Sequence, residues 1–500
     1  GSSGQVLTSQ GASAAPSWTS VSAAPEVTMT ASGAIGANKP VKVNSNGTVS
    51  EVSMAAPGFV GTGQVVNTGN PSFIRMAYTP DQDKVLLVYI RSNYTYMRLG
   101  TITAGAVTYG SEVQVDGNTA TEIAVCYDTW RDAFVIVLKQ GNNPYIFIAT
   151  VSGTSVSITS NRQRITTSAV DQLEVVEAPA AQRIVVFYRD QNNSYNLRGQ
   201  IGAWSNTYGN YEAWYGAQTV GSGNCLNPTA IYDPAANRGV VAWTDYDGGN
   251  WALRILQFTT TASSLSMGST VNIGTDIQRY GSNGGIKTLL NQGKAVFVFQ
   301  QGTSNLIARS ATISTSNPGT ISLIGSNTII EGGDHEYVIA ASQTSSANNG
   351  KIMVVFEDQG DSQKGKSKTL TMNSSGAFTV NNDLLTFNNE EVKHLAIIAD
   401  PDTDQFIVSN WTATNSSLLT HVYREESSNM TANDFLGFST AAISDTASGA
   451  IAVTGNTTTQ SSLTAGQKYY VQKNGTLGTS ADDPSVVAGI ALSSTKLLIK

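Results

Sequence analysis

Val85-Leu86-Leu87-Val88-Tyr89 is an uninterrupted apolar run that follows a polar turn, and six runs of the same kind come after it along the chain. They lie at 134–138, 184–188, 239–243, 295–299, 352–356 and 406–410. Successive runs are roughly fifty residues apart, and a fixed period of that length indicates one supersecondary unit repeated as a propeller or a solenoid.

Each unit carries the same order of signals around its apolar run, and the fourth unit is the clearest example. A short apolar strand, a turn, the run, a Gly/Asn hairpin and two further strands follow one another, at 228–232, 233–237, 239–243, 245–250, 251–257 and 264–273. Continuous Val, Ile and Phe favour a strand buried on both faces, and Gly and Asn favour tight hairpins. Four antiparallel strands per unit predict one blade, and a blade covers its two apolar faces only against neighbouring blades.

The segment 59–66 has the loose apolar alternation of the fourth strands but precedes the first unit, whereas no comparable strand follows the third strand of the seventh unit. We therefore expect residues 58–68 to supply the outer strand of the last blade, which closes the ring and removes its free edges. The fold class predicted is an all-β, seven-bladed β-propeller of four-stranded antiparallel blades. A solenoid with a capping strand is the alternative.

The two ends of the chain resemble each other. The sequence TASGAI occurs at both 30–35 and 446–451, and 42–49 parallels 470–477 through a shared Asn-Gly-Thr turn. The propeller therefore looks inserted between two short β-modules. The expected organisation is an attachment segment at 1–28, an N-terminal module copy at 29–53, the propeller at 54–430 and a C-terminal module at 431–500.

Composition restricts the class of protein. Only 13% of the 500 residues are charged and the net charge is -7, without a Lys/Arg run for tracking phosphates, so we expect no nucleic-acid partner. No apolar run approaches the ~20 residues of a membrane span. Cys126 and Cys225 fall in blades that are not neighbours, which favours two buried thiols over a disulfide or a zinc site.

The flanks resemble segments of bacteriophage tail-fibre and other virion proteins, especially marine and cyanobacterial ones. The sequences that carry this resemblance are GQVLTSQG at 4–11, APSW at 15–18, GQKYYV at 466–471 and VAGIALSSTKLLIK at 487–500. The resemblance implies a virion location, contacts with other virion proteins and a homotrimer whose short β-modules intertwine. Because the chain does not begin with Met, we also expect it to be part of a longer or processed polypeptide.

Motifs for catalysis are sparse. The hairpin 245–251 resembles a sialidase Asp-box once and imperfectly, and arginines recur on the third strands at Arg98, Arg198, Arg254 and Arg309. His335 and His394 open the first strands of blades six and seven, beside Asp334, Glu336, Glu390 and Glu391, where a metal or a general base is conceivable. We expect no catalytic residue, no metal and no cofactor, although paired carboxylates for glycoside cleavage need closeness only in space.

Aromatic residues give the one binding signal. They cluster in blade three, at Trp204, Tyr208, Tyr211, Trp214 and Tyr215, and either form a contact surface or fill the blade core. The function expected is a non-enzymatic fibre or spike subunit whose propeller binds a host surface glycan or protein. The alternatives are a glycan-depolymerising propeller enzyme on the virion and a capsid decoration or tail-collar protein.

Overall fold

The computed structural model describes residues 5–8, 15–20, 25–103, 105–207, 209–247, 249–278, 285–316, 319–344, 349–413, 415–425, 427–482 and 484–500. The chain divides into two compact units, one formed by Gly58–Arg424 and the other by Gly1–Pro57 together with Glu425–Lys500. Each unit is described separately.

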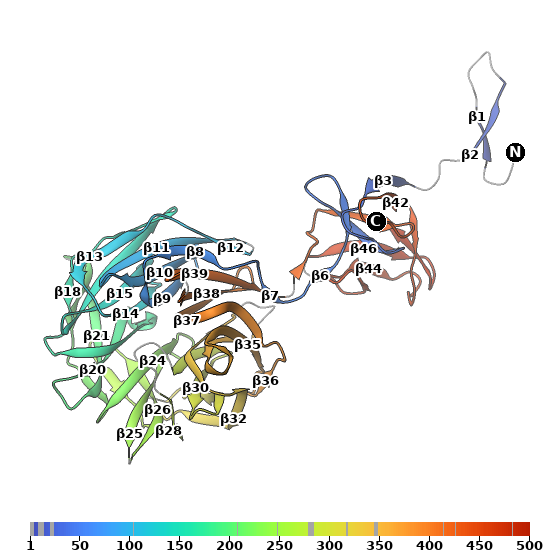
Figure 1. Cartoon of the computed structure of the whole chain (residues 1–500). Helices are drawn as coiled ribbons and strands as arrows, with labels where there is room; N and C mark the ends of the chain where they lie inside the picture. Colours follow the sequence, from blue (N-terminus) through green and yellow to red (C-terminus); the bar gives the residue numbers. More distant parts are fainter. Residues whose placement is uncertain are drawn as a thin grey trace. The chain divides into compact units, whose positions relative to one another are not determined.

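The larger unit is a seven-bladed β-propeller, as the repeat predicts (Figure 1). Each blade is an antiparallel sheet whose first strand lies at the axis. The strands of blades one to four are β9 (Ser72–Thr79), β10 (Lys84–Arg91), β11 (Tyr94–Thr103), β12 (Ala106–Tyr109) and β13 (Val113–Thr119); β14 (Glu122–Asp128), β15 (Ala133–Gln140), β16 (Asn143–Ser152), β17 (Ser155–Ile158) and β18 (Gln163–Arg164); β19 (Val170–Ala178), β20 (Arg183–Asp190), β21 (Asn196–Ser205), β22 (Asn210–Trp214) and β23 (Gln218–Gly221); β24 (Cys225–Asp233), β25 (Arg238–Asp247), β26 (Asn250–Thr260), β27 (Leu265–Met267) and β28 (Val271–Thr275).

Blades five to seven continue the ring. Their strands are β29 (Ile286–Asn291), β30 (Lys294–Gln301), β31 (Asn305–Thr312) and β32 (Ser322–Gly332); β33 (His335–Ser342), β34 (Lys351–Asp358), β35 (Lys364–Met372) and β36 (Phe378–Val380); β37 (Leu385–Asp400), β38 (Gln405–Thr412), β39 (Ser417–Arg424), β7 (Gly58–Phe59) and β8 (Gln64–Thr68). The long β37 pairs with β35 of blade six and with β38 of blade seven, so one strand serves both blades. Among the described residues, the single-turn 3-10 helices η1 (Pro179–Ala181) and η3 (Gln359–Asp361) lie in turns.

The ring is closed by the amino-terminal side of the propeller. Both β7 and β8 pair antiparallel with β39, with Phe59 opposite Tyr423 and Val65 opposite Leu419. The prediction for residues 58–68 is therefore confirmed, and the last blade contains strands from both ends of the unit.

The apolar runs form the second strand of every blade. Their hydrophobic residues are buried, each with an exposed fraction of 0–1%. Because side chains alternate along a strand, each run packs against both neighbouring blades. In blade one, Leu86 and Val88 pack against Phe134 of blade two, whereas Leu87 packs with Leu418 of blade seven. Each apolar run thus joins its blade to both neighbouring blades.

The smaller unit contains two five-stranded sheets of identical topology. The first has the order β3-β42-β41-β4-β5 and the second β43-β47-β46-β44-β45. The strands are β3 (Glu26–Thr30), β4 (Pro40–Val43), β5 (Val49–Glu51), β41 (Phe435–Ser439) and β42 (Ser448–Ala452); β43 (Thr457–Thr459), β44 (Lys468–Val471), β45 (Leu477–Gly478), β46 (Val486–Ala491) and β47 (Lys496–Ile499). A short pair, β6 (Met54–Ala55) with β40 (Ser427–Ser428), and a separate hairpin of β1 (Gln5–Thr8) and β2 (Ser17–Ser20) complete the described strands.

The two sheets match in detail. Register shifts occur at Val41/Lys42 in the first and at Tyr469/Tyr470 in the second, opposite Gly437 and Gly489 respectively. The turns after β4 and β44 carry the same hydrogen bonds, from the Thr48 and Thr476 amides to the side chains of the Asn two residues before. The similarity of 42–49 to 470–477 is therefore a structural repeat.

The first sheet corrects the expected module boundaries. It combines β3, β4 and β5 with β41 and β42, so residues 29–53 are completed by carboxyl-side strands that belong to the expected 431–500 module. The segments 30–35 and 446–451 are not equivalent positions of a repeat. They lie side by side in one sheet, where the Ala31 amide donates to the Ala447 carbonyl and the Thr446 amide donates to the Ala31 carbonyl.

The propeller follows β5 and precedes β41 in the first sheet. In the second sheet the equivalent strands, β45 and β46, are joined by the short segment 479–485. The propeller therefore occupies a position that is an ordinary loop in the other copy.

Candidate functional site

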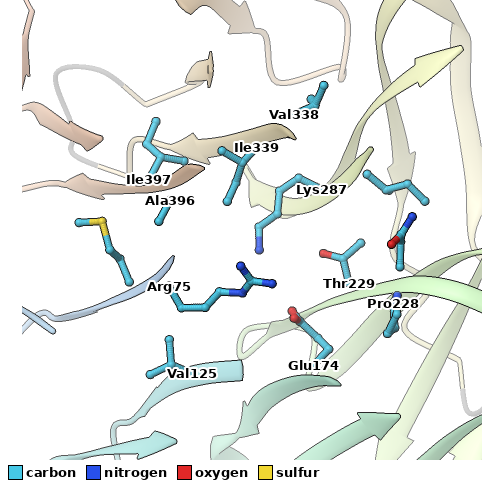
Figure 2. Close-up of a pocket in the computed structure, with 13 residues that line it drawn as sticks. Arg75, Val125, Glu174, Pro228, Thr229, Lys287, Val338, Ile339, Ala396 and Ile397 are labelled. Carbon is cyan, nitrogen blue, oxygen red and sulfur yellow. The ribbon is translucent and has the colours of Figure 1, made fainter. Parts of the chain in front are cut away.

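The axial channel of the propeller contains a cavity lined by charged and polar side chains. Four side chains on inner strands share one level, because each residue pairs with the fourth residue of its blade's apolar run. These are Arg75 opposite Val88, Glu174 opposite Phe187, Thr229 opposite Ala242 and Lys287 opposite Val298. All four line a cavity of about 110 Å³, and Figure 2 shows Arg75, Glu174 and Lys287 extending toward the same space from three different blades.

Backbone bulges precede three of these four side chains, those of Arg75, Glu174 and Thr229. In five inner strands a residue with positive φ lies two positions before the channel residue, and the strand register shifts there. These residues are Phe73, Gln172, Asn227, Tyr337 and His394, with φ of 47° to 58°. A bulge bends its strand and redirects the side chains that follow it. The described lengths of β14 and β29 pair without such a shift.

Hydrogen bonds connect the bulges of neighbouring blades. The amides of Gln172 and Leu173 donate to Oε2 of Glu122, at 2.6 and 3.3 Å, and the Gln172 side chain accepts from the Asn227 amide at 3.0 Å. Blades two, three and four are thereby joined around the channel, which fixes the position of Asn227.

Burial dominates the electrostatics of the channel. It lowers the pKa of Arg75, against the attraction of Glu174, and raises the pKa of Glu174, against the attraction of Lys287 and a hydrogen bond from the Ala230 amide. A shared, partly desolvated space strengthens charge interactions relative to bulk water. The level carries two cations and one carboxylate.

A second charged cluster lies between blades six and seven. Glu357 is 0% exposed, and burial together with the Glu336 carboxylate raises its pKa to about 8, against the nearby Lys393 ammonium. Lys393 forms an ion pair with Glu391 and lies over the Trp411 ring. A carboxyl with so high a pKa has the property of a general acid, but its oxygens do not reach solvent.

The two candidate histidines are separate. The His335 ring is buried beside Phe356 at 4.5 Å, whereas His394 stacks on Phe73 at 5.8 Å. Burial lowers the pKa of both, that of His394 to about 4, so both rings are neutral near pH 7. No group of three potential metal ligands in the described part of the chain includes either histidine.

The one acidic triad among the described residues belongs to turns. Asp83, Asp400 and Asp402 bring carboxylate oxygens within 4.8 Å of one another. The Tyr78 hydroxyl lies 3.3 to 3.4 Å from all three carboxylates, and Asp400 also accepts from the Asp402 amide. Equivalent Tyr-to-turn hydrogen bonds recur from Tyr232 to Asn237. The cluster is thus part of a repeated turn.

The aromatic candidates mostly fill blade three. Tyr211 is 0% exposed and its hydroxyl donates to Asp128, while Trp204 packs edge-on against Tyr211 at 5.4 Å. Trp204, Trp214 and Tyr215 are partly exposed and pack against the blade cores. Tyr208 lies outside the described residues.

The recurrent arginines are structural, and their partners lie in their own blades rather than in neighbouring ones. Arg198 is 3.7 Å from Asp190, Arg254 is 3.9 Å from Asp245, Arg98 is 4.0 Å from Glu112 and Arg309 donates to Asn327. Cys126 and Cys225 are free thiols; Cys225 is buried, as expected, whereas Cys126 is only partly buried.

The sequence patterns did not identify Arg75, Glu174 and Lys287. Counted back from the start of the second strand, Arg75 and Glu174 stand nine residues earlier but Lys287 only seven. The turns between the first and second strands cause this difference, because four residues separate the paired ends of the strands in blades one and three but only two do so in blade five. A constant sequence offset therefore does not reveal the shared level.

Comparisons with known proteins find similar solved structures but no family. No family model matches the chain, and no curated protein matches it. Among solved structures, the chain is similar to the β-propeller domain of Swd1 from Myceliophteria thermophila (10% identity, TM-score 0.43, 72% of this chain and 98% of that one). It is also similar to the periplasmic gluconolactonase PpgL of Pseudomonas aeruginosa (12%, 0.42, 72% and 96%) and the NanB sialidase of Streptococcus pneumoniae (10%, 0.41, 73% and 70%).

At these identities the likeness concerns the fold alone. No helix in the described part of the chain has the length and apolar character to cross a bilayer.

Proposed function

We propose that this protein is a non-enzymatic attachment protein, a fibre or spike subunit of a virion, whose propeller binds a ligand on a host surface. The observation that carries the proposal is the insertion of the propeller where the repeated β-module has only the loop 479–485. A module whose second copy closes its sheet without the insert does not need the propeller to fold. The insert is then free to serve recognition, and the modules serve attachment.

The amino-terminal hairpin supports the attachment role. Leu7 and Trp18 face each other across β1 and β2, and both are more than half exposed, at 56% and 54%. A two-stranded hairpin with an exposed apolar pair gains stability from a partner surface. Together with the resemblance of the flanks to phage fibres, this favours contacts with other virion proteins and a homotrimer, in which several weak binding sites act together.

Binding is favoured over glycan cleavage by the position of Glu357. Burial raises the pKa of its carboxyl to about 8, which suits a group that protonates a glycosidic oxygen, yet the residue is 0% exposed. A general acid must come within hydrogen-bond reach of the substrate.

The experiment is incubation of the full chain with a panel of bacterial surface polysaccharides, followed by binding measurements and an assay for new reducing ends. We expect saturable binding to some polysaccharides without release of oligosaccharide. Hydrogen exchange with the bound polysaccharide should protect propeller segments, with 204–215 the first region to inspect, and leave the module sheets unchanged. Release of oligosaccharide, or protection confined to the modules, would contradict the proposal.

Location and copy number are tested on particles. Antibodies against the propeller should label an exposed appendage, and sedimentation of the purified chain should give the mass of a trimer. A propeller that is inaccessible on intact particles would instead support a decoration or collar protein.

A further inference from the structure

Asn227 is the unusual residue of the axial channel. Its side chain is 8% exposed, lines the cavity, and neither its amide oxygen nor its amide nitrogen has a hydrogen-bond partner among the described residues. An unpaired buried polar group costs about 1–3 kcal/mol. Its backbone amide is held by Gln172, at 3.0 Å, so the side chain is positioned without having a protein partner of its own.

The charged side chains around Asn227 indicate the charge of the ligand that this cavity can bind. Arg75 and Lys287 reach the same cavity, and among the described residues that line it Glu174 is the one carboxylate, which leaves one positive charge in excess. All three side chains remain partly exposed, so the cavity communicates with solvent. A volume of about 110 Å³ fits a small planar group better than a whole sugar.

A carboxylate has the matching chemistry. Its two oxygens accept hydrogen bonds from a guanidinium fork, an ammonium and an amide NH₂ at once, and it carries a single charge. A dianion such as phosphate would meet Glu174 with a second negative charge. The side-chain carbonyl of Asn227 and the hydroxyl of Thr229 can then accept a hydrogen bond from a hydroxyl or N–H group next to the carboxylate of the ligand.

We propose that the axial cavity is a binding site for a small carboxylate, held by Arg75, Lys287 and the Asn227 amide. The source of the carboxylate is either a free organic acid or the acid group of a sugar that enters the channel. This site does not depend on the attachment function, because a channel ligand needs no cell surface.

The test is titration of the full chain with acetate, glucuronate and glucose by calorimetry, at constant ionic strength held with sodium chloride. Saturable binding of acetate, without binding of glucose, is the expected result. Binding of acetate without binding of glucuronate indicates that the natural ligand is a free organic acid. Binding of both acetate and glucuronate indicates that it is the acid group of a sugar. Saturation-transfer NMR on the acetate methyl gives an independent readout.

Variants locate the site. Asn227→Asp keeps the size of the side chain and a residue type that tolerates φ of 51°, but it replaces the donor with a negative charge. Lys287→Met removes one cation. Each should weaken acetate binding by about 10-fold or more. Lys84→Met is the matched control, because Lys84 begins the second strand of blade one and does not line the cavity.

Circular dichroism and thermal unfolding verify that the variants are folded. If acetate fails to saturate the folded wild-type chain, or if Asn227→Asp and Lys287→Met bind acetate like wild type, the proposed site is wrong. Equal binding of phosphate and acetate would overturn the preference for a single negative charge. None of these outcomes bears on attachment, which is measured with polysaccharide.

Discussion

Glu357 shows how one buried residue couples the propeller to pH. Its side chain is fully buried beside Glu336, and one carboxyl oxygen has no hydrogen-bond partner among the described residues. The folded chain holds the proton up to about pH 8, whereas the unfolded chain releases it near the ordinary glutamate pKa of 4.5. Between these values the unfolded state binds fewer protons, so stability falls as the pH rises.

We therefore expect Glu357→Gln to stabilise the propeller at pH 8 by about 2–4 kcal/mol and to leave it nearly unchanged at pH 4.5, because glutamine mimics the protonated carboxyl. Differential scanning fluorimetry at several pH values measures the difference. Glu212→Gln, at an exposed position of blade three, is the control and should have no pH-dependent effect. Parallel pH profiles for wild type and Glu357→Gln would contradict this account.

At the scale of elements, the module sheets depend on two glycines at the same bulge. A Cβ on Gly437 would lie 2.0 Å from the Ala452 carbonyl oxygen, and a Cβ on Gly489 would lie 1.9 Å from that of Leu498. Both contacts are with the backbone of the neighbouring strand, so no side-chain movement relieves them. The repeated bulge thus requires glycine in each copy.

Gly489→Ala should destabilise the module unit by about 2 kcal/mol or more, through displacement of β46 from β47. Limited proteolysis should then cut 456–499 faster while the propeller stays protected. The control is Gly466→Asn, because Gly466 has φ of 79° with nothing within 4 Å and its counterpart in the first copy is Asn38, with φ of 59°. Equal proteolysis of Gly489→Ala and wild type would show that the strands tolerate the displacement.

At the scale of the whole molecule, the closing strand determines whether the ring unfolds as one unit. Val66 on β8 is 9% exposed and packs with Ile74 and Leu418, which joins blades one and seven. Its neighbour Val65 points the other way and is 59% exposed. The same substitution at the two positions therefore distinguishes the contribution of ring closure to stability from the effect of a changed surface residue.

Val66→Asp should lower propeller stability by about 3 kcal/mol or more, because it buries a carboxylate without a partner, while Val65→Asp should change it by less than about 1 kcal/mol. Chemical denaturation followed by tryptophan fluorescence measures both. Similar losses for the two variants would mean that the closing strand contributes little to the ring.

The sequence by itself determined the seven repeats, the burial of the apolar runs and closure by residues 58–68, because strand alternation and turn residues act over a few positions and are visible in the chain. The partner strands of the amino-terminal module were decided only by tertiary structure, since β41 and β42 lie roughly 400 residues or more along the chain from the strands they pair with. So was the channel level of Arg75, Glu174 and Lys287, because it depends on the pairing of the first and second strands in three blades, whose connecting turns differ in length. Local patterns specify elements, whereas sites formed by several blades depend on the register between them.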